Sequence, residues 1–183
     1  MADLKGKNIA VGAIGSGVEA NARQIITAAG MDFEKDIHPK FLSFAEATSG
    51  LIAKQVDAAF LTAGIPTAAI QDLYAQNDVY IVAIDADVAA TLKEKYPFYT
   101  DFIIPAETYK GQMEDVQTLS VKSMLCVSAN MDDDLAYALT KQIYENLDFV
   151  ILAHNVGKYI TKETASEAMP IEMHPGALKY FNE

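Results

Sequence analysis

The sequence predicts an α/β fold whose core is an open, mainly parallel sheet. Short apolar runs of strand length alternate with stretches of helical period through the first two thirds of the chain. Some of these runs, such as residues 56–61 and 79–84, are almost continuously apolar, which is typical of strands covered on both faces. Alternation of this kind indicates right-handed strand–helix–strand crossovers, so we expect parallel strands in one sheet.

The pattern locates each expected element in turn. Strands are predicted at residues 7–12, 37–42, 56–62, 79–84 and 117–128. Helices are predicted between them at residues 17–29, 44–54, 65–76 and 87–96. Beyond residue 130 apolar residues recur at every fourth position after three aspartates that suit a helix N-terminus: Leu135, Leu139, Ile143 and Leu147. We therefore divide the chain into an α/β ligand-binding lobe at 5–116 and a return strand with C-terminal helices at 117–183.

Composition and charge exclude several classes of protein. The 183 residues are 51% hydrophobic and 21% charged, as in an ordinary globular protein, and their net charge of −11 argues against binding to nucleic acid or an anionic membrane surface. No apolar run approaches the ~20 residues that span a bilayer, and residues 1–7 lack the apolar core of a signal peptide. The single Cys126 lies in an apolar run, and we expect its thiol to be buried and unreactive.

A glycine-rich turn follows the first predicted strand. Gly12, Gly15 and Gly17 surround Ser16 there, and two interpretations stay open. Ser16 and Glu19 have the spacing of a capping box, in which each residue's side chain bonds the other's backbone amide. Alternatively, bare amides at the helix N-terminus bind an anion, since Gly15 and Gly17 allow a ligand to approach the backbone closely. The stretch Ser43–Glu46 has the same capping-box form, so one of the two is expected to be only a helix cap.

The common phosphate and nucleophile motifs do not fit this turn. A Walker A loop requires Gly-Lys-Ser/Thr, which is missing. The glycine order differs from the dinucleotide fingerprint, and no acidic residue ends the second predicted strand. A nucleophile elbow fails because Ile14 and Val18 stand where it requires glycine. If this turn binds an anion, we expect that anion to be a small carboxylate.

No group of residues predicts a reaction or a metal site. His38, His154 and His174 are far apart in sequence, and Asp85–Asp87 lacks the glycine of a calcium loop, so we interpret it as a helix cap. We expect a binding protein that is not an enzyme and that needs no cofactor or metal. An α/β enzyme with a phosphate or dinucleotide site at the glycine turn is the alternative. A folded remnant that binds no solute is a third interpretation.

Four sequence blocks, taken in order, resemble one family. They are DLKGKNIAVGAIGSGVEANARQIITAAG, LSFAEATSGLIAKQVDAAFLTAGIPTAAIQDL, IPAETYKGQMEDVQTLSV and HPGALKYF. Together they resemble the TAXI solute receptors, the substrate-binding proteins of one class of tripartite ATP-independent periplasmic (TRAP) transporters. Such receptors are similar to two-lobed, type II periplasmic binding proteins. The resemblance implies a periplasmic or otherwise extracytoplasmic protein that passes an amino acid, such as glutamate or glutamine, or another small carboxylate to TRAP permease subunits.

The resemblance also implies roles for individual residues. The turn Gly15, Ser16, Gly17, Val18 and Glu19 would offer amides and a hydroxyl to the carboxylate of the solute. A second wall would comprise Thr62, Ala63, Gly64 and Pro66, with Pro66 at a favoured early position of the next helix. Thr108 and Tyr109 would make a third contact, for which ordinary packing of Tyr109 is the alternative. The strand at 117–128 would be the return crossing between lobes.

This chain departs from the family pattern at three places. Val18 stands where the family usually has threonine, and Glu107 replaces a glycine near the expected site. Both changes favour a solute with a neutral or positive end over glutamate. The chain also begins at the strand that enters the second lobe, so we expect residues 117–183 to belong to a first lobe without its N-terminal part. Apolar surface left open on its helices would favour self-association.

Overall fold

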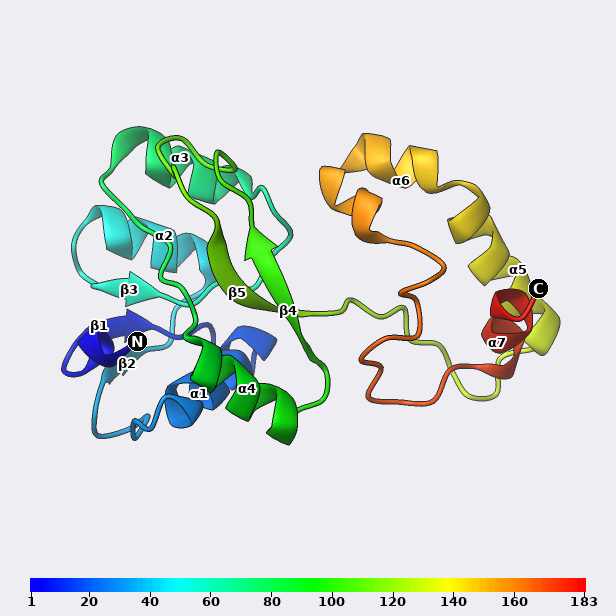
Figure 1. Ribbon diagram of the computed structural model, residues 1–183, viewed down its shortest axis with the longest axis horizontal. Coiled ribbons are helices and arrows are strands. Elements are labelled where there is room, and N and C mark those ends of the chain that lie inside the picture. The colour runs from blue at the N-terminus through cyan, green and yellow to red at the C-terminus, as the bar shows by residue number, and fades with distance from the viewer. The chain divides into compact units, whose positions relative to one another are not determined.

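Three short parallel strands form the sheet of the computed structural model, which describes residues 1–183. Strands β1 (Asn8–Ala10), β2 (His38–Lys40) and β3 (Ala58–Ala59) lie in the order β2-β1-β3. Both pairings are parallel, with Ile9 opposite Pro39 on one side and Ala58 on the other. The predicted α/β class with an open parallel sheet is therefore confirmed (Figure 1).

The central position of β1 places helices on both faces of the sheet. Helix α1 (Gly17–Ala28) links β1 to β2, whereas α2 (Phe44–Ile52) carries the chain from β2 past β1 to β3. Since right-handed crossovers in opposite directions fall on opposite faces, the two helices cover different sides. Side chains alternate accordingly, so that Ile9 and Val11 pack with residues of α1 and Ala10 packs with Ala47 of α2. This two-sided burial explains why Ile9, Ala10 and Val11 are all apolar.

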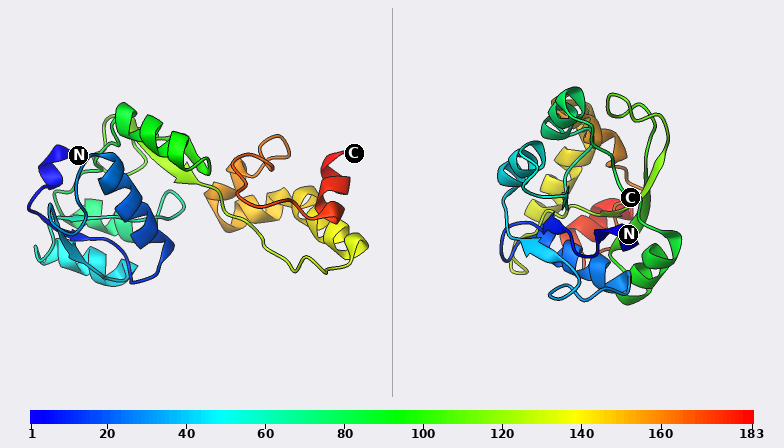
Figure 2. Two further views of the ribbon diagram at one scale, coloured as in Figure 1. Left: turned by 90° about the horizontal axis from the view of Figure 1, so that it is seen from below. Right: turned by 90° about the vertical axis from the view of Figure 1, so that its left-hand side faces the viewer.

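The next two helices complete the two layers. Helix α3 (Ala68–Gln76) packs against α2, and α4 (Ala86–Lys95) packs against α1. Figure 1 shows α2 and α3 above the sheet and α1 and α4 below it, and the left view of Figure 2 looks onto α1 and α4. All four predicted helices of the α/β part are present within a few residues of their expected ends.

The strand predicted at residues 79–84 does not form. Its backbone amides bond elsewhere: Ile81 N donates to the hydroxyl of Tyr74 at 2.9 Å, and Ile84 N donates to the carbonyl of Gln117 at 3.0 Å. Tyr80 is 86% exposed. The prediction was wrong because a run of apolar residues does not by itself provide a neighbouring strand. The sequence pattern also missed β4 (Tyr99–Ile104), which pairs with β5 (Val116–Val121) in a separate sheet.

The second half of the strand predicted at 117–128 is also absent. Strand β5 ends at Val121, and residues 123–128 continue without a strand partner and are exposed. Cys126 lies in this segment and is exposed, so the expectation of a buried thiol was wrong. The apolar composition of residues 123–128 predicted a buried strand, but no other part of the fold covers these residues.

The chain divides into two compact units. The first contains Met1–Tyr96 and Asp101–Leu119, and the second contains Pro97–Thr100 and Ser120–Glu183. The chain thus passes between the units within β4 and β5. The interpretation of residues 117–183 as part of an incomplete lobe stays a prediction.

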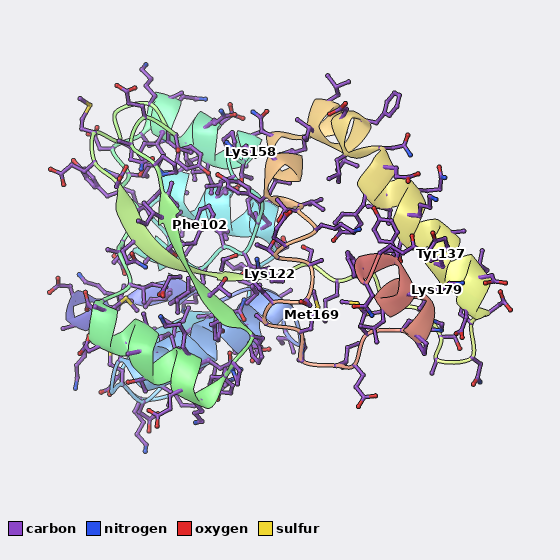
Figure 3. The ribbon with its side chains drawn as sticks, turned by 45° about the vertical axis from the view of Figure 1, so that its right-hand side comes forward. Phe102, Lys122, Tyr137, Lys158, Met169 and Lys179 are labelled. Carbon is purple, nitrogen blue, oxygen red and sulfur yellow. The ribbon has the colours of Figure 1, made fainter.

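Helices make up most of the second unit. They are α5 (Asp133–Glu145), α6 (Leu147–Ala153), the 3-10 helix η2 (Asn155–Tyr159) and α7 (Pro175–Phe181); a further 3-10 helix, η1 (Ala2–Leu4), lies in the first unit. Asp132 caps α5 as predicted, since its Oδ1 accepts from the amides of Asp134 and Leu135 at 3.0 and 3.1 Å. Helix α7 packs on α5 through the rings of Tyr137, Tyr144, Tyr180 and Phe181. Figure 3 shows Lys179 beside Tyr137, with its Nζ 5.1 Å from the centre of that ring.

Many large apolar side chains of the second unit are exposed. Leu125 and Leu152 are 71% and 82% exposed, and Leu135 of the predicted four-residue repeat is 51% exposed. The four-residue repeat therefore predicted the helix correctly, but its apolar residues do not form a buried face. Self-association through this surface stays a prediction, which light scattering over a range of concentrations would test.

We expect the cap of α2 to contribute measurably to stability. Ser43 Oγ accepts from Glu46 N at 3.4 Å, and Glu46 Oε2 accepts from Ser43 N at 2.8 Å, so the predicted capping box is complete. Replacing Ser43 by alanine should lower the free energy of unfolding by about 1 kcal/mol, measured by urea denaturation. The matched control is Ser49→Ala in the same helix, which removes no cap. Equal effects of the two variants would contradict the assignment.

Candidate functional site

The turn after β1 requires glycine at its first position. Gly12 has a φ of +94°, and a Cβ there would lie 2.8 Å from Val18 Cβ and 2.9 Å from Ser16 Oγ. Gly15 has a φ of +74° but open space around its Cα. A hydrogen bond of 3.0 Å from Ser16 N to Ala13 O closes the turn just before α1 begins. The backbone is thus folded tightly against the start of the helix.

A carboxylate of the protein already binds this turn. Ser16 Oγ accepts from Glu19 N at 3.2 Å, which is half of the predicted capping box. The other half differs from the prediction, because Glu19 Oε2 accepts from Gly15 N at 2.7 Å instead of from Ser16 N. Glu19 Oε1 accepts from Arg23, which also donates to Glu34. The Glu19 side chain thus folds back from the first turn of α1 onto the Gly15 amide.

These bonds make the turn sensitive to acid. The N–H of Gly15, followed by the guanidinium of Arg23, lowers the pKa of the Glu19 carboxyl below its ordinary value of 4.5. A lowered pKa in the folded state means that ionised Glu19 stabilises the fold above pH 4.5 and that this contribution is lost as the pH falls through the folded-state pKa.

We expect Glu19→Gln to lower the thermal midpoint at pH 7 because the Gly15 amide then bonds a neutral group. The difference from the wild type should shrink as the pH is lowered below 4.5, since the wild-type carboxyl is then protonated too. Circular dichroism melts between pH 7 and pH 3 measure this. Glu34→Gln removes the other partner of Arg23 and should give a smaller change at pH 7. A difference in thermal midpoint between the wild type and Glu19→Gln that stays constant with pH would contradict the role of the ionised Glu19 carboxylate.

The first amides of α1 remain available to a ligand. The first bond within the helix runs from Ala20 N to Ser16 O at 3.1 Å, so Gly17 N and Val18 N precede the intrahelical ladder. Gly17 is exposed, and a Cβ added to it would meet nothing within 4 Å. Amides at this position, together with the helix dipole, favour an anion.

The predicted second wall lies beside this turn. Strand β3 neighbours β1, and the Asn21 side-chain amide of α1 donates to Thr62 Oγ1 at 3.0 Å. The structure therefore places Thr62 beside α1, and the turn at 15–19 and Thr62 both follow the carboxyl ends of two adjacent parallel strands. Chain connections leave these two strands toward opposite faces, since α1 packs with α4 and α3 packs with α2. Open α/β sheets bind their ligands at such a switch point.

Pro66 has a different position from the one predicted. Helix α3 begins at Ala68 with Thr67 as its N-cap, so Pro66 precedes the helix and does not open it. The Ile65–Pro66 peptide bond is cis. Thr62, Ala63 and Gly64 are exposed, whereas Pro66 is partly buried.

Thr108 and Tyr109 lie in the loop between β4 and β5. The Thr108 hydroxyl donates to the Pro105 carbonyl at 2.7 Å. Tyr109 is only 2% exposed and stacks on Tyr74, with ring centres 5.3 Å apart. Its hydroxyl accepts from the Thr67 amide at 3.3 Å. Tyr109 thus packs behind the second wall, and direct contact with a solute stays a prediction.

Two connections of this region were missed from the sequence. The bond from Asn21 to Thr62 joins residues 41 positions apart, and no local pattern indicates it. The pair Glu19 and Arg23, in contrast, has the i,i+4 spacing of a helical ion pair and could have been found. No group of three His, Cys, Asp or Glu side chains is placed to hold a metal ion. No helix is both long and apolar enough to cross a membrane.

Comparison with known families agrees with this architecture. A parallel sheet with exposed turns at the carboxyl ends of adjacent strands is suited to holding a small molecule, as solute-binding proteins do. A family model described as the NMT1-like family matches residues 1–183. The chain therefore belongs to the NMT1-like family, a family of the periplasmic-binding-protein type, which indicates a solute-binding protein.

Proposed function

We propose that this chain is a TAXI-type receptor that captures a small carboxylate, of the amino-acid type, outside the cytoplasm for a TRAP permease. Family membership supports a solute-binding protein with a small-molecule ligand and a membrane transporter as partner. One observation carries the finer proposal: the Gly15 amide already binds a carboxylate, and the neighbouring amides of Gly17 and Val18 precede the helical ladder.

The proposed binding mode uses the backbone of the turn. The solute carboxylate accepts from Gly17 N and Val18 N, where the partial positive charge of the α1 N-terminus stabilises it. Thr62 stands at the other side through its bond with Asn21, and the exposed Ala63 and Gly64 continue that wall. Ser16 Oγ is engaged with Glu19 N, so it supports the turn and remains able to donate its own proton.

The charges around the turn favour a particular class of solute. Glu19 holds its carboxylate at the Gly15 amide, and the net charge of the chain is −11. A second carboxylate on the solute would be repelled, whereas an ammonium group would be attracted. We therefore propose a neutral amino acid, such as glutamine, in preference to a dicarboxylate.

Thermal unfolding in the presence of single compounds tests the proposal. The panel contains L-glutamine, L-glutamate, succinate and L-glutamine amide, the last of which lacks the free α-carboxylate. A true ligand at ~100 times its dissociation constant adds about 2.7 kcal/mol, which is roughly 5–10 °C in midpoint for a chain of this size. We expect L-glutamine to raise the midpoint and its amide to have no effect.

A variant separates binding from folding in the same experiment. Gly17→Ala places a methyl group in open space at a position without a positive φ, so the midpoint without solute should stay within about 2 °C of the wild type. The shift caused by L-glutamine should be lost, because the methyl group blocks approach to the amide. A midpoint unaffected by every compound in the panel would overturn the proposal.

A further inference from the structure

The loop at residues 105–115 is organised around one buried side chain. Gln112 is 7% exposed, and its Nε2 donates to the carbonyls of Ile104, Pro105 and Glu114 at 3.3, 3.0 and 3.1 Å. Its Oε1 is buried without a hydrogen-bond partner. A single amide therefore holds both ends of the loop together, so the loop has a defined conformation.

This conformation directs Tyr109 into the protein. Gln112 N donates to Tyr109 O at 3.1 Å, which fixes the backbone on either side of the ring. The ring is 2% exposed and lies nearly parallel to that of Tyr74, at an interplanar angle of 14°. Such a stack restrains both rings and, with them, the direction of the two hydroxyl groups.

The Tyr109 hydroxyl reaches the proposed binding wall through Thr67. It accepts from Thr67 N at 3.3 Å, and the Thr67 hydroxyl donates to the Gly64 carbonyl. Thr67 is the N-cap of α3, and its carbonyl accepts from amides of that helix, but its side chain makes no cap bond. The Thr67 amide and hydroxyl instead bond Tyr109 and Gly64. Residues of the loop at 105–115 and of the wall at 62–66, which are about 40 positions apart, thus share one hydrogen-bonded chain.

We infer that Tyr109 is a positioning residue, whose hydroxyl sets the conformation of the wall at 62–66 through the Thr67 amide. It acts on this wall from its buried side, through the bond that its hydroxyl accepts from Thr67 N. The consequence for affinity rests on the proposed function, whereas the coupling between Tyr109 and the wall does not.

Two matched substitutions test the inference. Tyr109→Phe removes only the hydroxyl that accepts from Thr67 N. Tyr74→Phe removes the hydroxyl of the other ring in the stack, which accepts from Ile81 N at 2.9 Å. Both variants keep the two rings and are expected to fold. Amide hydrogen exchange and ¹H–¹⁵N chemical shifts are measured first, without any solute.

The expected result separates the two variants. In Tyr109→Phe the Thr67 amide should exchange about 5-fold faster, and the amides of Thr62 and Gly64 should change their shifts. In Tyr74→Phe these amides should stay as in the wild type. The affinity for L-glutamine, measured by calorimetry, should fall about 5-fold in Tyr109→Phe and stay unchanged in Tyr74→Phe.

Two results would overturn the inference. Unchanged Thr62, Gly64 and Thr67 amides in Tyr109→Phe would exclude the coupling, whatever the protein binds. Altered amides with an unchanged affinity for L-glutamine would exclude an effect on binding, and the proposed function would stand. A wild-type protein that binds no compound of the panel would remove the proposed function, and the amide data would still decide whether Tyr109 positions the wall.

Discussion

Gly12→Ala is expected to lower the free energy of unfolding by about 2–4 kcal/mol. Two separate costs combine at this position. The φ of +94° is unfavourable for any residue with a side chain, and the new Cβ would lie within 2.9 Å of three atoms of the following helix turn. The affected atoms belong to Ser16, Val18 and Glu19, so solute binding should be lost with the stability. Urea denaturation followed by circular dichroism measures the effect.

Gly6→Ala is the matched control for Gly12→Ala. Gly6 has a φ of +76°, but nothing lies within 4 Å of its would-be Cβ, so only the backbone cost of about 1 kcal/mol applies. The loss in free energy of unfolding is expected to be larger in Gly12→Ala than in Gly6→Ala. The difference between the two losses then measures how closely the turn packs against α1. Equal losses in the two variants would show that the turn is not folded against the helix as described.

Gly176→Ala is expected to disrupt the second unit. A Cβ at this position would lie well inside van der Waals contact of the Asp133 carbonyl oxygen and 2.9 Å from Ala136 Cβ. Both of these atoms lie in the first turn of α5, and this turn cannot move without loss of the Asp132 cap. Helix α7 must therefore separate from α5, and the buried Tyr180 becomes exposed. We expect a loss of about 2–4 kcal/mol, because few other side chains are buried in this unit.

Hydrogen exchange locates this effect. Amides of α5 and α7 should lose protection in Gly176→Ala, whereas those of α1 and α2 should keep it, since the parallel sheet belongs to the other unit. Lys179→Ala on the same helix changes an exposed side chain and should stay within about 0.5 kcal/mol of the wild type. Unchanged protection of α5 and α7 in Gly176→Ala would contradict the close packing of these helices.

Local patterns in the sequence predicted the parallel sheet and the helices that cover it. Strands β1 to β3 lie within the predicted runs, and β1 and β3 pack against apolar residues of the core clusters. The run at 79–84 has the same composition and forms no strand, and β4, with alternating burial between Tyr99 and Ile104, was missed. Strand formation depends on a partner, which composition does not reveal.

The sequence likewise predicted only those parts of the candidate site that depend on neighbouring residues in the chain. The glycine turn and the Ser16 cap follow from local sequence, whereas the second wall was implied by the family resemblance. The hydrogen bonds that connect them follow from neither: Asn21 to Thr62, Thr67 to Tyr109 and Gln112 to the ends of its loop all depend on the packed fold. Glu19 shows the limit most clearly, because its carboxylate bonds the amide one residue before the predicted partner.

A titration of the ¹⁵N-labelled chain with L-glutamine, followed by ¹H–¹⁵N correlation spectra, tests whether the turn after β1 binds the carboxylate of a solute. We expect the amide signals of Gly17 and Val18 to shift most, those of Thr62 and Gly64 to shift less, and those of the cap at Ser43–Glu46 to stay unchanged. Binding that leaves the chemical shifts of the Gly17 and Val18 amides unchanged would contradict the assignment of this turn as the carboxylate site. A titration that shifts no signal at all would contradict it too.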